Sequence, residues 1–344
     1  MDVGGSKRFS MNAEVDITRK KNKQHGRRTA RTEDSVEAGP GEYVRVNPIT
    51  GVADDDVGSS VRLSSKHKGQ GLELSSERQA VTGWKGYRSV RATHGFHQGT
   101  HYCEVTVLHL GETGHCRLGW STNQSEINAP VGYDQFGFGY RDLEGSKVHK
   151  ALRSEYGEPF GEGDVLGLFL HMPEGGKTLE ARKNELVRHK GALYHEVPPG
   201  QDPAPLPGSV VAFTRNGVLQ GEAFRDIPEG TYYPTVSLFT LQRQKEGAKV
   251  AFNFGPEFKF PPPVLEGCPA AAPMSDVPAR QQAAAAAEEA AAIADPAAAA
   301  GSNPPAQQPD APLAAAAAGR EGTPGTAPAG QAAAADDADV AVDG

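Results

Sequence analysis

The stretch HYCEVTVLHL, residues 101–110, alternates apolar and polar side chains. Apolar residues occupy the odd positions from Cys103 to Val107, and polar residues occupy the two positions between them. Successive side chains of a β-strand point to opposite sides of its sheet, so this pattern predicts a strand with one face in a core. Strands of this kind, rather than helices, decide the fold of the chain.

Further segments on the C-terminal side repeat the strand pattern, and none of the body carries the 3.6-residue apolar stripe of an amphipathic helix. The nearly continuous apolar run DVLGLFLHM predicts a strand that is buried on both faces. Asn216-Gly217, between two apolar runs, predicts a hairpin with a type I′ turn. These patterns predict an all-β protein, an antiparallel sandwich. The further segments are CRLGW (116–120), DVLGLFLHM (164–172), VVAFTRNGVLQG (210–221), YYPTVSLF (232–239) and KVAFNFG (249–255).

Composition divides the 344 residues into three parts. Residues 1–42 are polar and basic and are expected to be a disordered arm, whereas 43–263 hold the strands of one sandwich domain. The 173–208 segment of that domain is long and polar, which suggests an insertion between core strands. Residues 264–344 are rich in Ala and Pro and are expected to be a low-complexity acidic tail, because they offer little apolar surface to bury. Its alanine-rich stretch 281–294 favours a short helix.

The net charge of −8 hides an uneven distribution. Residues 19–32 hold seven Lys and Arg and no acid, so this arm is typical of a nuclear-import signal and also suits contact with DNA phosphates. The three cysteines lack metal-binding spacing, and neither a signal peptide nor a membrane-spanning run is predicted. The candidate DNA-binding residues are Arg19, Lys20, Lys21, Lys23, Arg27 and Arg28.

The stretch GYDQFGFGYR, residues 132–141, combines four aromatic residues with three glycines and an arginine. Its rings suggest an RNA-stacking strip, a piece of core, or a protein-binding loop; the first requires amphipathic helices that the body lacks. Aromatic residues beside arginine are typical of binding hot spots. Strand alternation also points Arg117 away from the apolar face of CRLGW, so Arg117, Tyr133 and Arg141 are candidates for a patch that binds an acidic peptide.

Catalysis is not predicted. His94, His97 and His101 are close in sequence, but the chain has no GxSxG or HExxH motif, and no second acid lies two positions from Glu104 on its strand face. We therefore expect a protein that is not an enzyme and that holds no metal or cofactor.

A series of motifs, in order, resembles the SPRY (B30.2-type) domain of the Ash-2-like subunits of COMPASS/MLL-type histone methyltransferase complexes. The resemblance runs from about Leu72 to Pro262, and PMSD at 273–276 is similar to the extension that follows the domain in that family. The motifs are GWKGYRSVRATHG (83–95), HYCEVTV (101–107), RLGWS (117–121), NAPVGYDQFGFGYRD (128–142), GSKVH (145–149), GEGDVLGLFLHMPE (161–174), RNGVLQGEAFRDI (215–227), YYPTVSLF (232–239) and VAFNFGPEFKFPP (250–262).

This resemblance implies a bent antiparallel sandwich in a nuclear, non-catalytic scaffold subunit. In the family, the SPRY domain binds an acidic segment of a WD-repeat subunit (retinoblastoma-binding-protein-5-like), and the pair supports the SET-domain enzyme that methylates lysine 4 of histone H3. The basic arm would touch nucleosomal DNA. By position in the motifs, the resemblance implies that the protein-binding residues are Tyr87, Arg117, Pro130, Tyr133 and Arg141. Phe136 and Phe138 are expected to be structural.

The sequence departs from the family pattern in two places. A basic residue expected two positions after Arg141 is replaced by Leu143, unless Lys147 takes its role. The stretch 281–294 offers Ile293 as its one large apolar residue, which argues against docking into a Dpy-30-like dimer through this segment. The alternative functions are an RNA-binding SPRY protein and a SPRY substrate adaptor of a ubiquitin ligase, although no RING, B-box or SOCS-type segment accompanies the domain.

Overall fold

The computed structural model describes residue 58, residues 60–176 and residues 204–294. It also describes the backbone of four short strands, which pair in the order β1-β2-β14-β13. The pairing joins the predicted arm to the predicted insertion, because β1 pairs with β2 and β2 pairs with β14. The candidate DNA-binding residues lie outside the described residues. The four strands are β1 (Phe9–Ser10), β2 (Glu42–Arg45), β13 (Leu186–His189) and β14 (Ala192–Val197).

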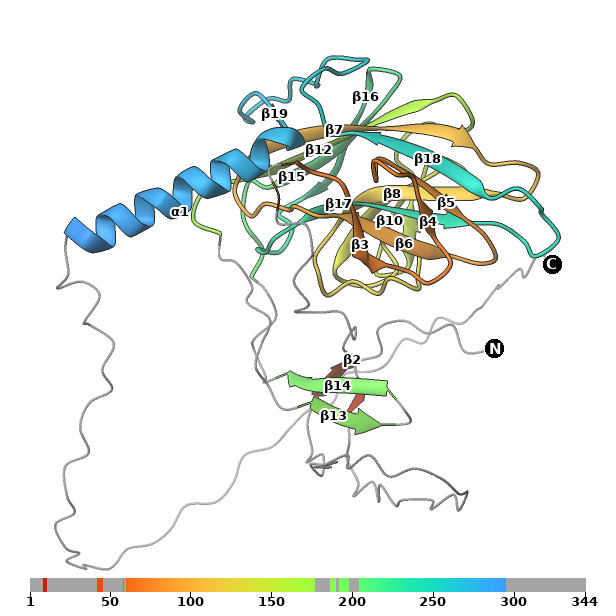
Figure 1. Ribbon diagram of the computed structural model, residues 1–344, viewed down its shortest axis with the longest axis horizontal. Helices are drawn as coiled ribbons and strands as arrows, with labels where there is room; N and C mark the ends of the chain where they lie inside the picture. Colours follow the sequence, from red (N-terminus) through yellow and green to blue (C-terminus); the bar gives the residue numbers. More distant parts are fainter. Residues whose placement is uncertain are drawn as a thin grey trace, which may run out of the picture. The chain divides into compact units, whose positions relative to one another are not determined.

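Seven antiparallel strands form the first sheet, in the order β11-β10-β9-β8-β17-β6-β3 (Figure 1). Strands β8 to β11 pair with their neighbours along the chain, whereas β17 joins β8 to β6 from a distant part of it, so the centre of the sheet depends on long-range pairing. The strands are β3 (Leu63–Lys68), β6 (Arg88–Ala92), β8 (His115–Ser121), β9 (Gly137–Arg141), β10 (Lys147–His149), β11 (Leu152–Ser154) and β17 (Tyr233–Phe239).

The second sheet has the order β16-β15-β12-β7-β18-β5-β4, and β19 pairs in parallel with the start of β7. It stacks face to face on the first sheet, as the all-β sandwich prediction requires (Figure 1). The strands are β4 (Glu73–Leu74), β5 (Ala80–Gly83), β7 (Gly99–His109), β12 (Val165–Met172), β15 (Val210–Arg215), β16 (Val218–Arg225), β18 (Ala248–Asn253) and β19 (Ala272–Pro273).

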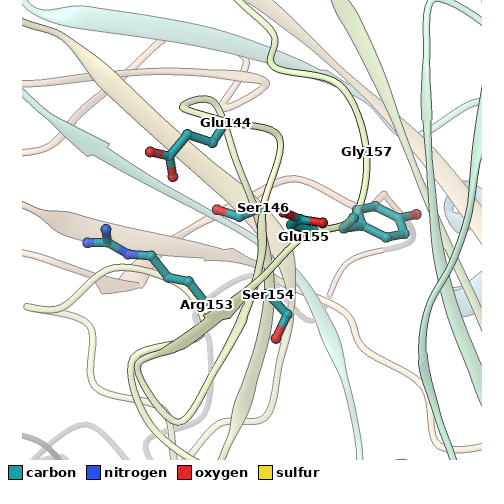
Figure 2. A pocket seen from close by; sticks show the side chains of 7 residues that line it. Glu144, Ser146, Arg153, Ser154, Glu155 and Gly157 are labelled. Carbon is teal, nitrogen blue, oxygen red and sulfur yellow. The ribbon is translucent and has the colours of Figure 1, made fainter.

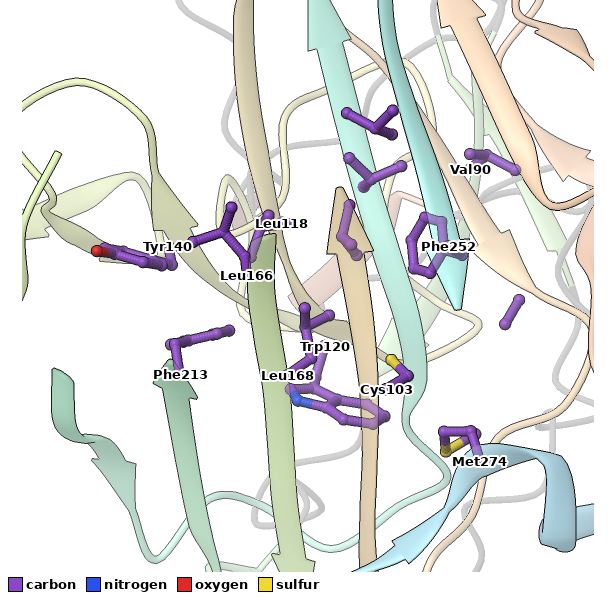
Figure 3. Packing of buried hydrophobic residues seen from close by; sticks show 14 of the residues in the cluster. Val90, Cys103, Leu118, Trp120, Tyr140, Leu166, Leu168, Phe213, Phe252 and Met274 are labelled. Atoms are coloured by element: carbon purple, nitrogen blue, oxygen red, sulfur yellow. The ribbon is translucent and has the colours of Figure 1, made fainter. Parts of the chain in front are cut away.

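The main core lies between the two sheets and is built from the inward faces of the alternating strands (Figure 3). Leu118 and Trp120 of β8 face Cys103 of β7 and Leu168 of β12 in this cluster, and all four are fully buried. Burial of such side chains contributes about 1.5–3 kcal/mol each, so the alternation predicted from the sequence is what closes the sandwich.

The outer face of the second sheet carries a smaller apolar cluster, in which Tyr102, Phe169 and Ala212 are packed against Leu265. Because this face is also covered, β12 is buried at every residue from Val165 to Met172. The prediction of a strand that is buried on both faces is confirmed. The covering chain comes from the segment after β18.

That covering segment corrects the expected domain boundary at Pro263. Leu265 is buried against the second sheet, Met274 lies in the main core, and Val277 is 2% exposed. These residues continue the sandwich, so the domain extends to about residue 277. The low-complexity composition of this stretch does not predict that its few apolar residues are buried. A short 3-10 helix, η1 (Met274–Asp276), follows β19.

The helix predicted at 281–294 is present but begins earlier, as α1 (Val277–Ala294) (Figure 1). Its first turn is held by Val277 and by the Gln281 side chain, which donates to the carbonyl of Gly95 at 2.8 Å. The described residues of α1 beyond the first turn are exposed. The helix therefore depends on alanine propensity after its first turn.

Two hairpins differ in how clearly the sequence predicts their turns. The predicted Asn216-Gly217 turn connects β15 to β16 with both residues at positive φ, 51° and 82°, as a type I′ turn requires. The turn between β10 and β11 uses Lys150 and Ala151, also at positive φ, 53° and 63°. Neither residue type favours that conformation, so the second hairpin carries no sequence signal.

Candidate functional site

A row of polar residues crosses the outer face of the first sheet. Arg141 of β9 is the register partner of Arg117 on β8, Arg117 pairs with Ser237 on β17, and Ser237 pairs with Ser89 on β6. Directly paired residues project from the same side of a sheet. The row therefore faces away from the core that holds the alternate residues of the same strands, such as Leu118.

Arg117 is buried although it lies on the outer face, with 8% of its surface exposed. Its guanidinium carbon lies 5.0 Å from the ring centre of Tyr87. Burial lowers the pKa of Arg117, and the charge of Arg141 acts in the same direction, whereas Tyr87 opposes both. Burial likewise raises the pKa of the Tyr87 hydroxyl. The ring attracts the guanidinium through its negative face, and the partly dry surroundings strengthen the electrostatic attraction between the guanidinium and an anion.

Rings continue the surface beyond Arg117. Phe239 lies 5.0 Å from Tyr87 and 5.9 Å from the imidazole of His115, with centroids as the reference points. His115 shares a 2.8 Å hydrogen bond between its Nδ1 and Oδ2 of the buried Asp142. The aromatic rings thus form one wall beside the arginine row.

Arg141 is the second buried arginine, at 9% exposure. Its NH1 lies 3.3 Å from Oε2 of Glu144. Several buried polar atoms at this place have no hydrogen-bond partner among the described residues: Nε of Arg117, Nε of Arg141, Oδ1 of Asp142 and Oγ of Ser146. Buried polar groups are nearly always bonded, so these four unpartnered atoms set this part of the outer face apart.

The loop that carries Pro130 and Tyr133 lies against the same outer face. The backbone N–H of Val131 donates to Oγ of Ser237 at 3.1 Å, and Oγ of Ser89 donates to the carbonyl of Ala129. A Cβ on Gly139 would lie 2.9 Å from the carbonyl oxygen of Val131, so a glycine allows this close approach. Pro130 and Tyr133 are half-buried, and the N–H of Tyr133 donates to the carbonyl of Pro130 at 3.1 Å.

Of the five predicted site residues, Tyr87, Arg117 and Arg141 are in one cluster. Pro130 and Tyr133 belong to a loop that is hydrogen-bonded to the row of Arg117, so all five lie on one face of one sheet. Both arginines are more buried than a simple surface patch would be. Phe136 and Phe138 are buried, at 8% and 3% exposure, which confirms their structural role.

A pocket adjoins this cluster at the β10–β11 hairpin (Figure 2). It is lined by Glu144, Ser146, Arg153, Ser154, Glu155, Tyr156 and Gly157. Its walls carry two acids and one arginine, so its chemistry is mixed rather than uniformly basic.

The SPRY domain family matches residues 100–196 of the chain. These residues hold β7, β8, β9 and β12, which are central strands of both sheets. Residues 100–196 are therefore similar to a SPRY domain.

Several curated relatives of the chain are Ash2 subunits, and others are ATP-dependent RNA helicases of the DDX1 type. The Set1/Ash2 histone methyltransferase complex subunit ASH2 of Drosophila melanogaster is 36% identical over 220 residues, which are 60% of this chain and 38% of that protein. The subunit ash-2 of Caenorhabditis elegans is 33% identical over 232 residues, which are 62% of this chain and 39% of that protein. The chain thus spans about two fifths of the length of these relatives.

Among solved structures, the SPRY domain of human HERC1 is 19% identical, with a TM-score of 0.37. That match covers 55% of this chain and 96% of the HERC1 domain.

Lys147 does not take the role of the basic residue that is missing after Arg141. Its Nζ donates to the carbonyl of Ala223 at 2.7 Å and lies 5.4 Å from the ring centre of Phe224. Lys147 pairs with Tyr140, a core residue, so it projects from the opposite side of the sheet to Arg141. The alternation of β10 decides this, and the sequence around Lys147 did not show where β10 begins.

In the part of the chain that the structure describes, no group of three His, Cys, Asp or Glu residues is arranged to hold a metal ion. The described helices include none that is long and apolar enough to cross a membrane. His94, His101 and His171 are buried. Burial lowers the pKa of His101 to about 4.

Sequence reasoning missed four residues near the site: His115, Asp142, Phe239 and Arg153. Phe239 and His115 are register partners one residue beyond the pair formed by Leu238 and Cys116, so correct pairing of β8 with β17 would have found them. Arg153 depends on the β10–β11 hairpin, whose turn has no sequence signature.

Proposed function

We propose that this chain is a non-catalytic scaffold subunit of a COMPASS/MLL-type histone H3 lysine-4 methyltransferase complex, acting in the nucleus. The proposal is supported by the Ash2 relatives, which are named as subunits of Set1/Ash2 histone methyltransferase complexes. The similarity covers about 60% of this chain and about two fifths of each relative, so the proposal is limited to the role of the SPRY-like sandwich.

The observation that carries the proposal is the pair of buried arginines on the outer face of the first sheet. Arg117 and Arg141 are direct register partners, and like charges in that arrangement repel each other. Each retains an unpartnered Nε among the described residues. A ligand carboxylate would relieve the repulsion, because guanidinium groups bind carboxylates through paired N–H donors.

The ligand that fits is an acidic segment of the WD-repeat (retinoblastoma-binding-protein-5-like) subunit. An extended segment has backbone and apolar atoms that suit the rings of Tyr87 and Phe239, and acidic side chains that suit the arginines. The half-buried Pro130 restricts its loop before binding, which reduces the entropy lost on docking. The resulting pair would hold the SET-domain subunit in its active arrangement, so the chain acts by assembly.

The proposal includes weak contact of nucleosomal DNA with the basic arm, through Arg19, Lys20, Lys21, Lys23, Arg27 and Arg28. Phosphate contacts of this kind release counterions and weaken steeply as salt rises. Deletion of residues 1–40 should therefore reduce DNA affinity and flatten its salt dependence. A gel-shift titration over rising salt tests this, and equal affinity of the deleted protein would refute the role of the arm.

Docking into a Dpy-30-like dimer is not part of the proposal. The described side chains of α1 after its first turn are alanine and polar residues, and groove-binding helices need several large apolar anchors on one face.

Affinity purification of the tagged full chain from nuclear extract tests the assembly. Co-recovery of a WD-repeat protein and a SET-domain protein supports the proposal, and purified chain alone should not methylate histone peptide. Recovery of RNA that resists about 0.3 M salt, where phosphate-only binding fades, would instead favour the RNA-binding alternative. Recovery of a ubiquitin ligase without a SET-domain protein would favour the adaptor alternative.

A further inference from the structure

The β10–β11 hairpin extends the first sheet beyond Arg141. Gly139 of β9 is the register partner of Val148 on β10, and Val148 is the partner of Arg153 on β11. Partners share a face, and Gly139 lies two residues before Arg141 on the same strand. Arg153 therefore projects from the outer face that carries Arg117 and Arg141, although its hairpin follows them in sequence.

Arg153 lines the pocket next to this cluster and is exposed (Figure 2). No described residue forms a hydrogen bond or an ion pair with its side chain. The charge of Arg153 contributes to the lowered pKa of Arg117, which is consistent with the short separation that the register implies. A third arginine is thus available beside the two buried ones, and its guanidinium is open to solvent.

Glu144 forms an ion pair with Arg141, so a carboxylate of the protein itself already binds this arginine. The turn that follows β9 is closed by a 2.9 Å hydrogen bond from the N–H of Arg141 to the carbonyl of Ser146. Glu144 and Gly145 in this turn have φ of 60° and 61°. The Glu144 side chain is 75% exposed, whereas that of Arg141 is 11% exposed. The ion pair therefore covers the solvent side of Arg141, where a ligand carboxylate would have to bind.

Resting on the function proposed above, we propose that the acidic segment continues past Arg117 and Arg141 into the hairpin pocket. There Arg153 pairs with one of its carboxylates, and the segment displaces Glu144 from Arg141. Arg153 supplies from β11 the positive charge that Leu143 does not supply after Arg141. Glu144 makes binding a competition between two carboxylates, which favours a segment with several acids over one with a single acid.

The magnitude of both effects follows from their exposure. Ion pairs between exposed groups contribute about 0.2–1 kcal/mol, which corresponds to as much as about fivefold in affinity. Arg153→Gln should therefore weaken binding by about twofold to fivefold, and Glu144→Gln should tighten it by a similar factor. Glu155, the second acid of the pocket, remains present in both variants and does not alter the comparison.

The probe is a fluorescein-labelled dodecapeptide of alternating glutamate and serine, and its glutamine counterpart reports charge-independent binding. Affinities of the full chain and its variants are measured by fluorescence anisotropy at fixed salt. Lys249→Gln is the matched control for loss of one positive charge, because Lys249 is exposed on β18 of the second sheet. Glu222→Gln is the matched control for the acid, because Glu222 pairs with Arg225 on β16.

A double-mutant cycle separates local competition from general charge. If Glu144 acts by occupying Arg141, Glu144→Gln gains affinity in the wild-type background and gains much less when Arg141 is already Ala. An equal gain in both backgrounds, or an Arg153→Gln loss no larger than that of Lys249→Gln, overturns the inference. The function proposed above fails separately, if Arg117→Ala binds the peptide as tightly as the wild type does.

Discussion

The outer faces of the two sheets both carry buried charges, but they treat them differently. On the second sheet, the carboxylate of Glu104 is 2% exposed. It accepts hydrogen bonds from the backbone N–H groups of Lys259 and Phe260 at 2.8 Å each, and from Nδ2 of Asn253 at 3.2 Å. On the first sheet, Arg117 and Arg141 are almost as buried, yet they lie opposite each other and retain unpartnered nitrogens among the described residues.

This difference separates a charge buried for folding from a charge buried for binding. Glu104 fastens the segment after β18 across the sheet, so its charge is fully used within the chain. In the arginine row, some hydrogen-bonding groups have no partner among the described residues and two like charges lie together. Both features destabilise the free protein, and binding of an acidic partner would offset this destabilisation. Burial alone therefore does not identify a functional residue; the arginine row differs from Glu104 because it also brings two like charges together.

The largest expected effect on stability is on the second sheet, where the hydrogen bonds of Glu104 are made within the chain. Glu104→Ala removes the acceptor of three N–H donors and leaves two backbone N–H groups without a partner, at about 1–3 kcal/mol each. We expect the free energy of unfolding to fall by about 3–5 kcal/mol in urea titrations followed by tryptophan fluorescence. A loss under about 1 kcal/mol would mean that the segment after β18 is not fastened through this carboxylate.

Acid is also expected to destabilise the protein through a buried group, His101, where β19 joins β7. Burial lowers the pKa of His101 to about 4, and the charge of Arg280 acts in the same direction. The unfolded chain, with a histidine pKa of about 6.5, binds the proton more readily, so stability is full above pH ~6.5 and falls as the pH approaches 4. Each unit of difference is worth about 1.4 kcal/mol, which gives a loss of about 3 kcal/mol.

His101→Gln tests this effect because Nδ1 of His101 has no hydrogen-bond partner among the described residues, and a glutamine amide can replace the imidazole beside the backbone of Pro273 without binding a proton. Urea unfolding at several pH values should show a smaller acid loss in the variant than in the wild type. Burial also lowers the pKa of His149 and His171, so some acid dependence remains. Identical pH profiles for the two proteins would contradict the role of His101.

The smallest effect on stability is expected on the first sheet, at the arginine row. Arg117→Ala removes a like-charge pair along with some packing against Tyr87, so the free energy of unfolding should change by less than about 1 kcal/mol. Its affinity for the acidic dodecapeptide should fall about tenfold, which is the loss of one well-made charged contact. The proposed difference between the two outer faces would be wrong if the affinity were unchanged, or if Arg117→Ala lowered the free energy of unfolding as much as Glu104→Ala does.

The sandwich could be predicted because its strands carry their periodicity in sequence. The unbroken apolar run of β12 and the Asn216-Gly217 turn both predicted features that the structure contains. Tyr87, Arg117 and Arg141 could be named from motif resemblance, and the outward direction of Arg117 from alternation alone. Local rules suffice wherever the answer depends on neighbours in the chain.

The rest depended on register between distant strands. Arg153 is near Arg141 because of a hairpin turn made by Lys150 and Ala151, for which no sequence preference exists. Whether Lys147 replaces the missing basic residue could not be predicted for the same reason, since the side of the sheet that it occupies depends on where β10 begins. Met274 and Val277 are isolated apolar residues in a polar stretch, so composition assigned them to the tail although they are buried.

The parallel pairing of Ala272 with His101 has a consequence for the timing of synthesis. β7 leaves the ribosome long before the short strand that completes its edge, and elongation proceeds at about 5–20 residues per second. The nascent sandwich must therefore wait, with the apolar outer side of β12 open to solvent and to chaperones, until Leu265 and the rest of the segment after β18 emerge. A stop codon just after β18 would release a chain whose two sheets are made except for β19 but whose second sheet lacks its cover.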